Sequence, residues 1–467
     1  MTYHIACQMM IELAEIGLPQ LDAAVELPRI PPEEYEGRIR ALRDAVDSEW
    51  VAIYGDREHV GNLAFVCGFD PRFEEALLLL GRDGRRILIV GTEGIGHSQG
   101  VSIDLERVHV PTFSLMGIDR SQGSALADAL AACGVGSGHT VGLVGWKSLE
   151  PSEWTAAAPG LVAPAFLADA LRDAVGDTGR VVDVTDVLMA VDGLRLRNSA
   201  DQLAVFEWGA SRSSACVLEI IGNAEAGVSE LALFSAMTYC GEPMLYHPIL
   251  TSGEDIPLGL RSPTGRVVGK GDPIFTTIGM WGGNCGRGGI LGGGDSDSHA
   301  DNPDFLGRVA IPYWRTIVAW WENVRIGARG SDLHEMLAGL CAEQGFKPIL
   351  NTGHQQDWED WPNTPFRGGT DARIASGMTL AVDIFSASNS PSQMIHCEDT
   401  VAVADDDLRA ELAERHPAVW ARIRARQDFV REELGVQAPD ELLPLTTTPA
   451  YLPPYWLAPS LALRATG

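Results

Sequence analysis

The spacing of apolar residues divides the chain into two regions. Up to about residue 190, short apolar runs such as residues 51–55 and 140–146 alternate with amphipathic stretches such as residues 35–46 and 164–175. Short apolar runs are typical of buried strands, and apolar residues three or four apart are typical of helices. The alternation predicts a mostly parallel or mixed sheet that is covered by helices.

The pattern changes after residue 199. Residues 200–224 predict one long helix, and a second helix and several strands follow it. Another helix pair is expected at about residues 305–327 and 331–345, again followed by strands. Two helix pairs that each precede strands indicate a duplicated α/β half. We predict an N-terminal domain of residues 1–192 and a C-terminal domain of residues 193–467, onto which the apolar C-terminal tail docks.

Composition and charge argue against some classes of binding partner. The 467 residues carry a formal charge of −28, with 45% hydrophobic and 21% charged residues, as in ordinary globular proteins. Because an acidic surface repels nucleic acid and anionic membranes, we expect neither as a partner. We see no signal peptide and no apolar run long enough for a membrane span. Eight scattered cysteines without a CxxC pair favour reduced thiols in a cytoplasmic protein.

Eight short segments resemble, in order, motifs of the creatinase/prolidase/aminopeptidase P superfamily. They read NLAFVCGFDPRFEE, GLRLRNSADQLAVFEWGASRSSACV, AGVSELAL, HPILTSGED, GKGDPIFTTIG, TGHQQDWEDWP, ASGMTLAVDI and HCEDTVAVAD. The resemblance implies an N-terminal creatinase-type α/β domain followed by a C-terminal pita-bread domain, of mixed α+β and α/β class, usually in a homodimer. It also implies that NLAFVCGF forms a strand followed by a turn.

The metalloenzymes of this superfamily bind two divalent ions through two aspartates, one histidine and two glutamates. By resemblance, the first aspartate falls on Thr277 and the second, eleven residues later, on Gly288. His354 matches the ligand histidine, Asp383 stands in place of the first glutamate, and Glu398 matches the second. One histidine and two carboxylates cannot fill the shells of two cations about 3.5–4 Å apart. We therefore expect no resident metal and no other cofactor, although a single weakly held metal stays open.

Other positions also depart from the superfamily pattern. Its second histidine falls on Trp361, and the arginine before its Glu-Asp pair falls on His396. Creatinase, the metal-free enzyme of the superfamily, has its catalytic histidine where this chain has Leu260, so its mechanism does not carry over intact. The glycine-dense residues 281–298 lack the GxxxxGK[ST] pattern, and we do not expect them to bind phosphate.

The retained histidine and carboxylates are the candidate catalytic residues. His354 follows a glycine in a polar, aromatic segment, where it is suited to acid–base catalysis; the alternative is a hydrogen-bonded interior histidine. Asp383 interrupts an apolar strand, where a buried carboxylate is costly unless it is paired or functional. Alternation along the next strand places only one of Glu398 and Asp399 inside. The superfamily motif assigns the inward position to Glu398. Asp399 is then expected to lie in solvent or to pair with a helix.

Six other residues are candidates for binding the substrate. Arg287 lies among glycines that let a ligand approach the backbone, and its guanidinium could hold a carboxylate. Arg72 resembles by position the creatinase turn that reaches the partner subunit's active site; the alternative is a surface arginine paired with Glu74 or Glu75. Cys285 would be a nucleophile only beside a base. The other three candidates are Thr277, His247 and Trp361.

The resemblance and these residues together imply a metal-independent, creatinase-like enzyme that acts on a C–N bond of a small amino-acid-like or guanidino substrate by hydrolysis or elimination. His354 would transfer a proton, and Asp383 and Glu398 would hold a cationic group. Arg72 or Arg287 would bind a carboxylate. Two alternatives stay open: a metal-dependent Xaa-Pro aminopeptidase or dipeptidase with altered ligands, and a non-catalytic pita-bread binding protein.

Overall fold

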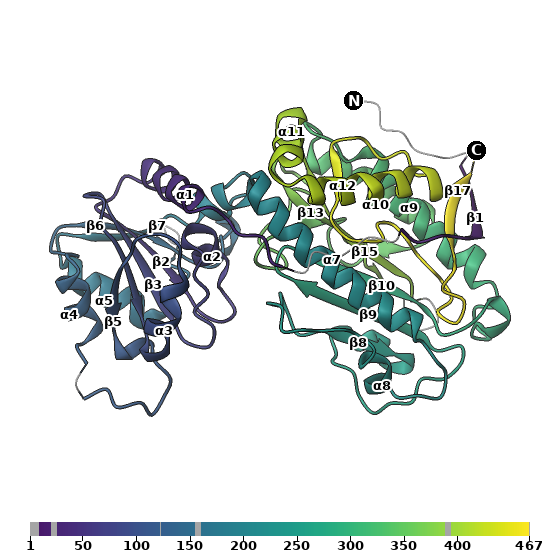
Figure 1. The fold of residues 1–467 in the computed structure, drawn as a ribbon, viewed down its shortest axis with the longest axis horizontal. Coiled ribbons are helices and arrows are strands. Elements are labelled where there is room, and N and C mark those ends of the chain that lie inside the picture. The colour runs from purple at the N-terminus through teal and green to yellow at the C-terminus, as the bar shows by residue number, and fades with distance from the viewer. Residues whose placement is uncertain (1–8, 20–25, 122, 155–159, 388–393, 467) are drawn as a thin grey trace. The chain divides into compact units, whose positions relative to one another are not determined.

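Contacts divide the chain into two compact units (Figure 1). We call Ile30–Arg197 the inserted unit, and Met1–Arg29 together with Asn198–Gly467 the main unit. The structure is a computed structural model that describes residues 9–19, 26–121, 123–154, 160–387 and 394–466.

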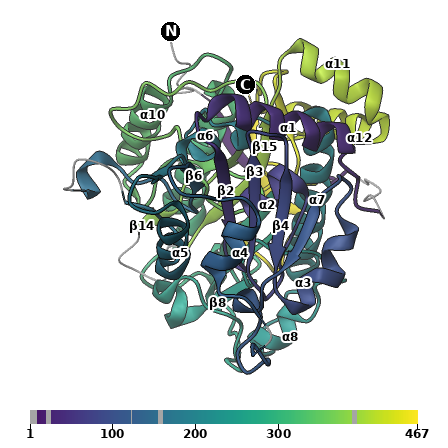
Figure 2. The same cartoon turned by 90° about the vertical axis from the view of Figure 1, so that its left-hand side faces the viewer.

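The inserted unit contains a mixed sheet covered by helices, as the sequence predicted (Figure 2). The described strands run in the order β5-β4-β3-β2-β6-β7, and β2–β3 and β3–β4 pair antiparallel while the other pairs are parallel. Their bounds are β2 Trp50–Gly55, β3 Ala76–Gly81, β4 Arg86–Val90, β5 Glu106–His109, β6 Thr140–Val144 and β7 Arg180–Asp183.

Helices of the inserted unit bury one apolar face against this sheet. Leu130 of α4 and Leu167 and Leu171 of α5 share one core with Leu77 and Leu143 of the strands. The helices are α1 Pro32–Ala45, α2 Gly61–Cys67, α3 Thr92–His97, α4 Leu126–Ala132, α5 Ala165–Val175 and α6 Asp186–Met189. The expected strand at NLAFVCGF is wrong: this segment is helix α2, which is buried on every side, and an apolar run of this length does not distinguish a buried helix from a strand.

The main unit is built on an antiparallel sheet that carries the predicted catalytic residues. The strand order is β12-β13-β15-β10-β9-β8. A further strand, β16, also pairs with β15. The bounds are β8 Ile249–Ser252, β9 Pro273–Met280, β10 Gly283–Ile290, β12 His354–Gln355, β13 Thr379–Val382, β15 His396–Val403 and β16 Leu442–Pro444. A separate short pair joins β11 Lys347–Pro348 to β14 Ser386–Ala387.

The long predicted helix is α7, Ala200–Gly222, and it packs directly on the β9–β10 hairpin (Figure 1). Gly209 allows this close approach, because a Cβ there would lie 2.0 Å from the carbonyl oxygen of Trp281 in the hairpin turn. Val217 and Ile220 of the same helix share a core with Ile278 of β9. The other helices are α8 Glu230–Phe234, α9 Ile311–Asn323, α10 Gly330–Glu343, α11 Asp406–Arg415 and α12 Pro417–Asp428.

The two ends of the described chain pair with each other. β1, Met10–Glu15, runs antiparallel to β17, Leu461–Thr466. This pairing explains why the units differ from the predicted domains, which assigned residues 1–192 to one body. Residues 10–15 are far from the main unit in sequence but belong to it through this two-stranded sheet. Among the described residues, no helix combines the length and the apolar character needed to cross a membrane.

A buried carboxylate ties α7 to α12, and its pKa gives a testable pH dependence. Glu207 accepts hydrogen bonds from Arg422 at 2.9 Å and from Arg426 at 2.7 Å. Burial raises the pKa of Glu207, but the two guanidinium groups outweigh it and lower the pKa. The stabilisation is therefore complete above the ordinary glutamate pKa of about 4.3 and is lost as the pH falls below it.

We expect Glu207→Gln to lower the free energy of unfolding by about 2 kcal/mol at pH 7, as for hydrogen bonds to charged groups. The difference from wild type should shrink on acidification, because Glu207 is then protonated in the unfolded wild-type chain, and this proton uptake favours unfolding. Urea unfolding at pH 7 and pH 4 measures both values. A difference that grows at pH 4 would contradict the assigned ion pairs.

Candidate catalytic site

Three neighbouring strands bring the predicted catalytic residues together. His354 begins β12, Asp383 directly follows β13, and Glu398 lies on β15. β13 pairs with both of the other strands, so residues distant in sequence meet at one place in the sheet. Each of the three side chains has an exposed fraction below 10%.

The imidazole of His354 faces one oxygen of each carboxylate. Its Nε2 lies 3.9 Å from Asp383 Oδ2 and 3.7 Å from Glu398 Oε1. Its Nδ1 lies 2.9 Å from the carbonyl oxygen of Gln355, to which a protonated Nδ1 donates. The backbone contact therefore holds the ring with Nε2 directed at the acids.

A second histidine, His396, completes the cluster. It lies two residues before Glu398 on β15, and side chains two apart on a strand share a face. Its Nε2 is 3.9 Å from Asp383 Oδ1 and 3.5 Å from Glu398 Oε2. Each carboxylate thus turns one oxygen to each imidazole. His396 was predicted only to stand in place of an arginine of the superfamily, although its spacing from Glu398 already indicates that both side chains share a face.

Neutral hydrogen-bonding groups surround Glu398. Asn284 Nδ2 donates to Glu398 Oε1 at 2.6 Å and to Asp360 Oδ1 at 3.0 Å. The Thr277 hydroxyl lies 3.5 Å from Glu398 Oε2 and 2.8 Å from the hydroxyl of Tyr246. Asp360 and Tyr246 were not among the predicted site residues, because neither lies in a position that the resemblance assigns to a function.

The environment shifts the pKa values of the acidic groups in opposite directions. Burial and the charge of Glu398 raise the pKa of Asp383, and burial raises the pKa of Asp360. Burial also acts to raise the pKa of Glu398, but the contacts with His354 and His396 lower it. Burial lowers the pKa of His354, but Glu398 and the neighbouring acids outweigh it and raise the pKa to about 9. Opposed shifts within one buried cluster are typical of functional sites.

Aromatic rings enclose both imidazoles. Trp361 stacks on His354, with 4.2 Å between ring centroids and 12° between ring planes. Phe275 and Phe385 contact His396 at centroid distances of 5.2 Å and 4.9 Å. Trp361 has an exposed fraction of 36%, so its ring separates His354 from solvent. Both Trp361 and Thr277, which were predicted to contact the substrate, therefore border the cluster.

Arg287 and Cys285 point away from the cluster, and their predicted substrate contacts need correction. They alternate on β10 with Asn284 and Gly286, which face Glu398. Arg287 binds Asp399 through Nη2, at 2.8 Å and 3.0 Å, on the other face of the sheet. Cys285 belongs to an apolar core, and burial raises the pKa of its thiol, so it is not poised as a nucleophile.

Asp399 was expected to lie in solvent or to pair with a helix, and this expectation is wrong, because the residue is fully buried. The alternation along β15 holds, but both faces of this strand are covered. Strand periodicity gives the face of a residue and does not show whether that face meets solvent. Asp399 therefore has a structural role in the ion pair with Arg287.

The two remaining candidates are outside the cluster. His247 is exposed in the segment before β8, next to Tyr246, whose hydroxyl bonds to Thr277. Arg72 belongs to the inserted unit, where its exposed guanidinium lies 3.4 Å from Asp70 and not against Glu74 or Glu75. Its backbone φ is 62°, a value uncommon for a residue other than glycine. The role of Arg72 across a dimer stays a prediction.

The β9–β10 hairpin shows whether the cluster fits the two-ion centre of the superfamily. Thr277 pairs directly with Gly286. Gly288, on which the second aspartate of the superfamily falls, comes two residues later on the same strand. A Cβ on Gly286 would lie 2.9 Å from Glu398 Oε2, so this glycine faces the cluster and leaves room for its carboxylate. A threonine and a glycine replace two charged ligands, so a two-ion centre does not fit.

A single cation does fit the cluster. His354, Asp383 and Glu398 offer ligand atoms that lie within 4.8 Å of one another. Among the described residues, the buried Asp383 Oδ1 has no hydrogen-bond partner. A buried carboxylate oxygen without a donor is costly, and a cation would satisfy it.

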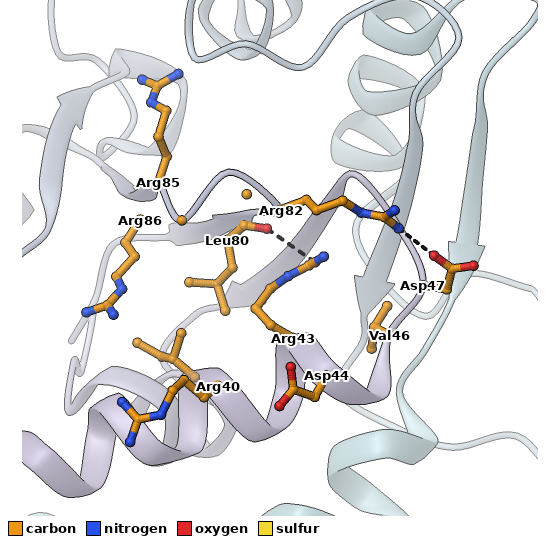
Figure 3. A pocket seen from close by; sticks show the side chains of 12 residues that line it. Arg40, Arg43, Asp44, Val46, Asp47, Leu80, Arg82, Arg85 and Arg86 are labelled. Atoms are coloured by element: carbon orange, nitrogen blue, oxygen red, sulfur yellow. Dashed lines mark hydrogen bonds and ion pairs between the residues drawn. The ribbon is translucent and has the colours of Figure 1, made fainter.

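A cavity of about 540 Å³ in the inserted unit has a different character (Figure 3). It is lined by arginines, but Arg82 is bonded to Asp47 and Arg43 to the carbonyl oxygen of Leu80. Arg86 pairs with Glu36. Because acids and carbonyl groups already hold these side chains, and because the guanidinium groups diverge, the cavity does not form a catalytic cluster.

Comparison with known structures identifies the fold. The prolidase from Thermococcus sibiricus superposes with a TM-score of 0.61 at 14% identity, over 81% of this chain and 95% of that one. The Xaa-Pro dipeptidase from Bacillus anthracis gives 0.58 at 14% identity, over 80% and 96%. The X-Pro aminopeptidase from Thermotoga maritima MSB8 gives 0.59 at 15% identity, over 79% and 95%.

The chain has the pita-bread fold. This confirms the fold that the eight short motifs predicted, with its creatinase-type domain and its pita-bread domain. No protein-family model and no curated protein matches the sequence. At this level of identity the likeness establishes the fold, and the chemistry has to be argued from the cluster itself.

Proposed function

We propose that this pita-bread protein is a hydrolase that cleaves a C–N bond of a small amino-acid-like or guanidino substrate. The observation that carries the proposal is the convergence of His354, Asp383 and Glu398, all buried, from three strands. Buried carboxylates that contact imidazoles without a lysine or arginine counter-charge indicate binding or catalysis. The structures of the same fold named above are peptidases, and a peptide bond is a C–N bond.

Two versions of this chemistry differ in whether a cation takes part. In the metal-independent version predicted from the sequence, His354 Nε2 exchanges a proton with the substrate while Asp383 and Glu398 hold its cationic group. The second version is a metal-dependent enzyme with altered ligands, and His396 favours it because it adds a second imidazole. A bound divalent cation would polarise the scissile group of the substrate.

Several groups around the cluster are suited to orient a small polar substrate. The Thr277 and Tyr246 hydroxyls and the Asn284 amide offer hydrogen bonds beside Glu398. Because Asp399 holds Arg287, Arg72 is the remaining predicted carboxylate-binding residue. Its contribution from the partner subunit of a homodimer is part of this proposal.

The proposal is tested by turnover on a panel of Xaa-Pro dipeptides, creatine and related guanidino acids. His354→Ala should lower kcat/KM for the best substrate by about 10²-fold or more, as for loss of an acid–base or ligand group. His299→Ala is the matched control, because this histidine is exposed and pairs only with the neighbouring Asp301 among the described contacts.

Activity of His354→Ala within threefold of wild type would contradict the assignment. Binding of panel members without turnover would instead identify a non-catalytic binding protein. Dialysis against a chelator separates the two versions of the chemistry. Activity that survives supports the metal-independent version, and activity that is lost and restored by added metal supports the version with altered ligands.

A further inference from the structure

We propose that His354, His396, Asp383 and Glu398 together hold one divalent cation, with Zn²⁺ preferred. The site is the one of the proposed function, and the inference deepens that function by giving His396 the role of a ligand. The four residues form a closed ring in which imidazoles and carboxylates alternate. The N···O distances around the ring are 3.9, 3.7, 3.9 and 3.5 Å.

These distances match the edges of a coordination shell. Two atoms that each lie about 2.1 Å from Zn²⁺ at a tetrahedral angle are about 3.4 Å apart. The observed separations are slightly longer, and they are too long for direct hydrogen bonds between imidazole and carboxylate. They join six atoms, because each carboxylate faces His354 with one oxygen and His396 with the other. The ligand atoms of His354, Asp383 and Glu398 already lie within 4.8 Å of one another, and His396 would complete the shell by moving toward them.

The orientation of the His354 ring agrees with a ligand role. Its Nδ1 is held by the carbonyl oxygen of Gln355, and this outer contact is the usual one for a metal-bound histidine. The ring is therefore oriented with Nε2 toward both carboxylates. A cation bound here would also satisfy Asp383 Oδ1, which has no hydrogen-bond partner among the described residues.

The neutral residues of the β9–β10 hairpin favour one ion over two. Thr277 and Gly286 offer no charge for a second buried cation, and a buried charge without a partner is costly. Where the superfamily resemblance expects an arginine, this chain has His396. A guanidinium there would repel a cation, and an imidazole can bind it. Mixed imidazole and carboxylate ligands suit Zn²⁺.

The experiment measures binding by the whole chain after removal of metal with a chelator. Isothermal titration with Zn²⁺ and elemental analysis should give one ion per chain. His396→Ala should weaken the affinity by about 100-fold or more, since loss of an outer-shell partner alone costs 10–100-fold. His396→Arg should abolish binding, and His299→Ala should leave it unchanged.

Two bound ions per chain, no bound ion, or unchanged affinity in His396→Ala would each overturn the inference. If the His396 variants do not fold, Co²⁺ bound to the wild-type chain decides. Intense visible absorption indicates four-coordinate Co²⁺ and supports the site, and the weak bands of six-coordinate Co²⁺ overturn it. Binding is measured without substrate, so a chain that binds one ion but turns over nothing loses only the proposed function. An active chain without an ion loses only this inference.

Discussion

Replacing Asp399 with asparagine is expected to lower the free energy of unfolding by about 3–5 kcal/mol, the cost of leaving a buried charge without its partner. Arg287 has an exposed fraction of 1% and Asp399 of 0%. Asparagine preserves the shape of the side chain, but it removes the negative charge opposite the guanidinium. The other acceptors for Arg287 cannot replace this charge, because they are neutral backbone carbonyl oxygens. They belong to Tyr451, Thr448, Glu398 and Gly286.

Urea unfolding at pH 7 measures this effect. Asp169→Asn is the matched control, because Asp169 pairs with Arg172 on an exposed helix face and should change stability by less than about 0.5 kcal/mol. A loss below about 1 kcal/mol in Asp399→Asn would show that the pair is not essential. The pair also affects the site, since Asp399 and Arg287 are the chain neighbours of Glu398 and Gly286 on the facing strands.

Replacing Glu398 with glutamine is expected to have the largest effect on activity, a fall in kcat/KM of about 10⁴-fold, at the upper end for loss of a catalytic group. Glu398 faces both imidazoles and accepts from Asn284, so no other side chain in the cluster contacts as many of its members. Glutamine has nearly the same shape but cannot offer two anionic oxygens to the two histidines.

The same variant should also lose stability. The contacts with His354 and His396 hold the pKa of Glu398 below its ordinary value, so the ionised carboxylate stabilises the folded chain at neutral pH and the neutral amide does not. Steady-state kinetics and thermal unfolding on the same preparation measure both effects. Glu411→Gln, on an exposed face of α11, is the control for activity. If Glu398→Gln kept activity within tenfold of wild type, Glu398 would not be a central group of the site.

The fold could be predicted from the sequence because many weak signals agreed. Helix α7 and strands such as β2 and β6 follow from periodicity, and short motifs in order gave the pita-bread architecture. The prediction failed where apolar runs were ambiguous, as at α2, and where pairing is long-range, as between β1 and β17. No local pattern shows that residues 10–15 pair with residues 461–466.

The candidate site could be predicted in part. Position within the motifs selected His354, Asp383 and Glu398, which the structure brings together. It did not select His396, because the motif expects an arginine there, nor Asp360, which enters the cluster through a loop. Arg287 was misplaced because its face of β10 depends on the register of the β9–β10 hairpin. Types of residue can thus be read from the sequence, whereas their partners across strands cannot.

The pairing of β1 with β17 has a consequence during synthesis on the ribosome. The inserted unit is complete once residue 197 has been made, and it can fold while the rest of the chain is still being translated. β1 has to wait until Leu461–Thr466 emerge, on the order of tens of seconds at roughly 5–20 residues per second. During that time the backbone groups of β1 lack their native partner strand and are free to pair with other segments or other chains. β1 is therefore the first strand of the main unit to be synthesised and among the last to form its native pairing.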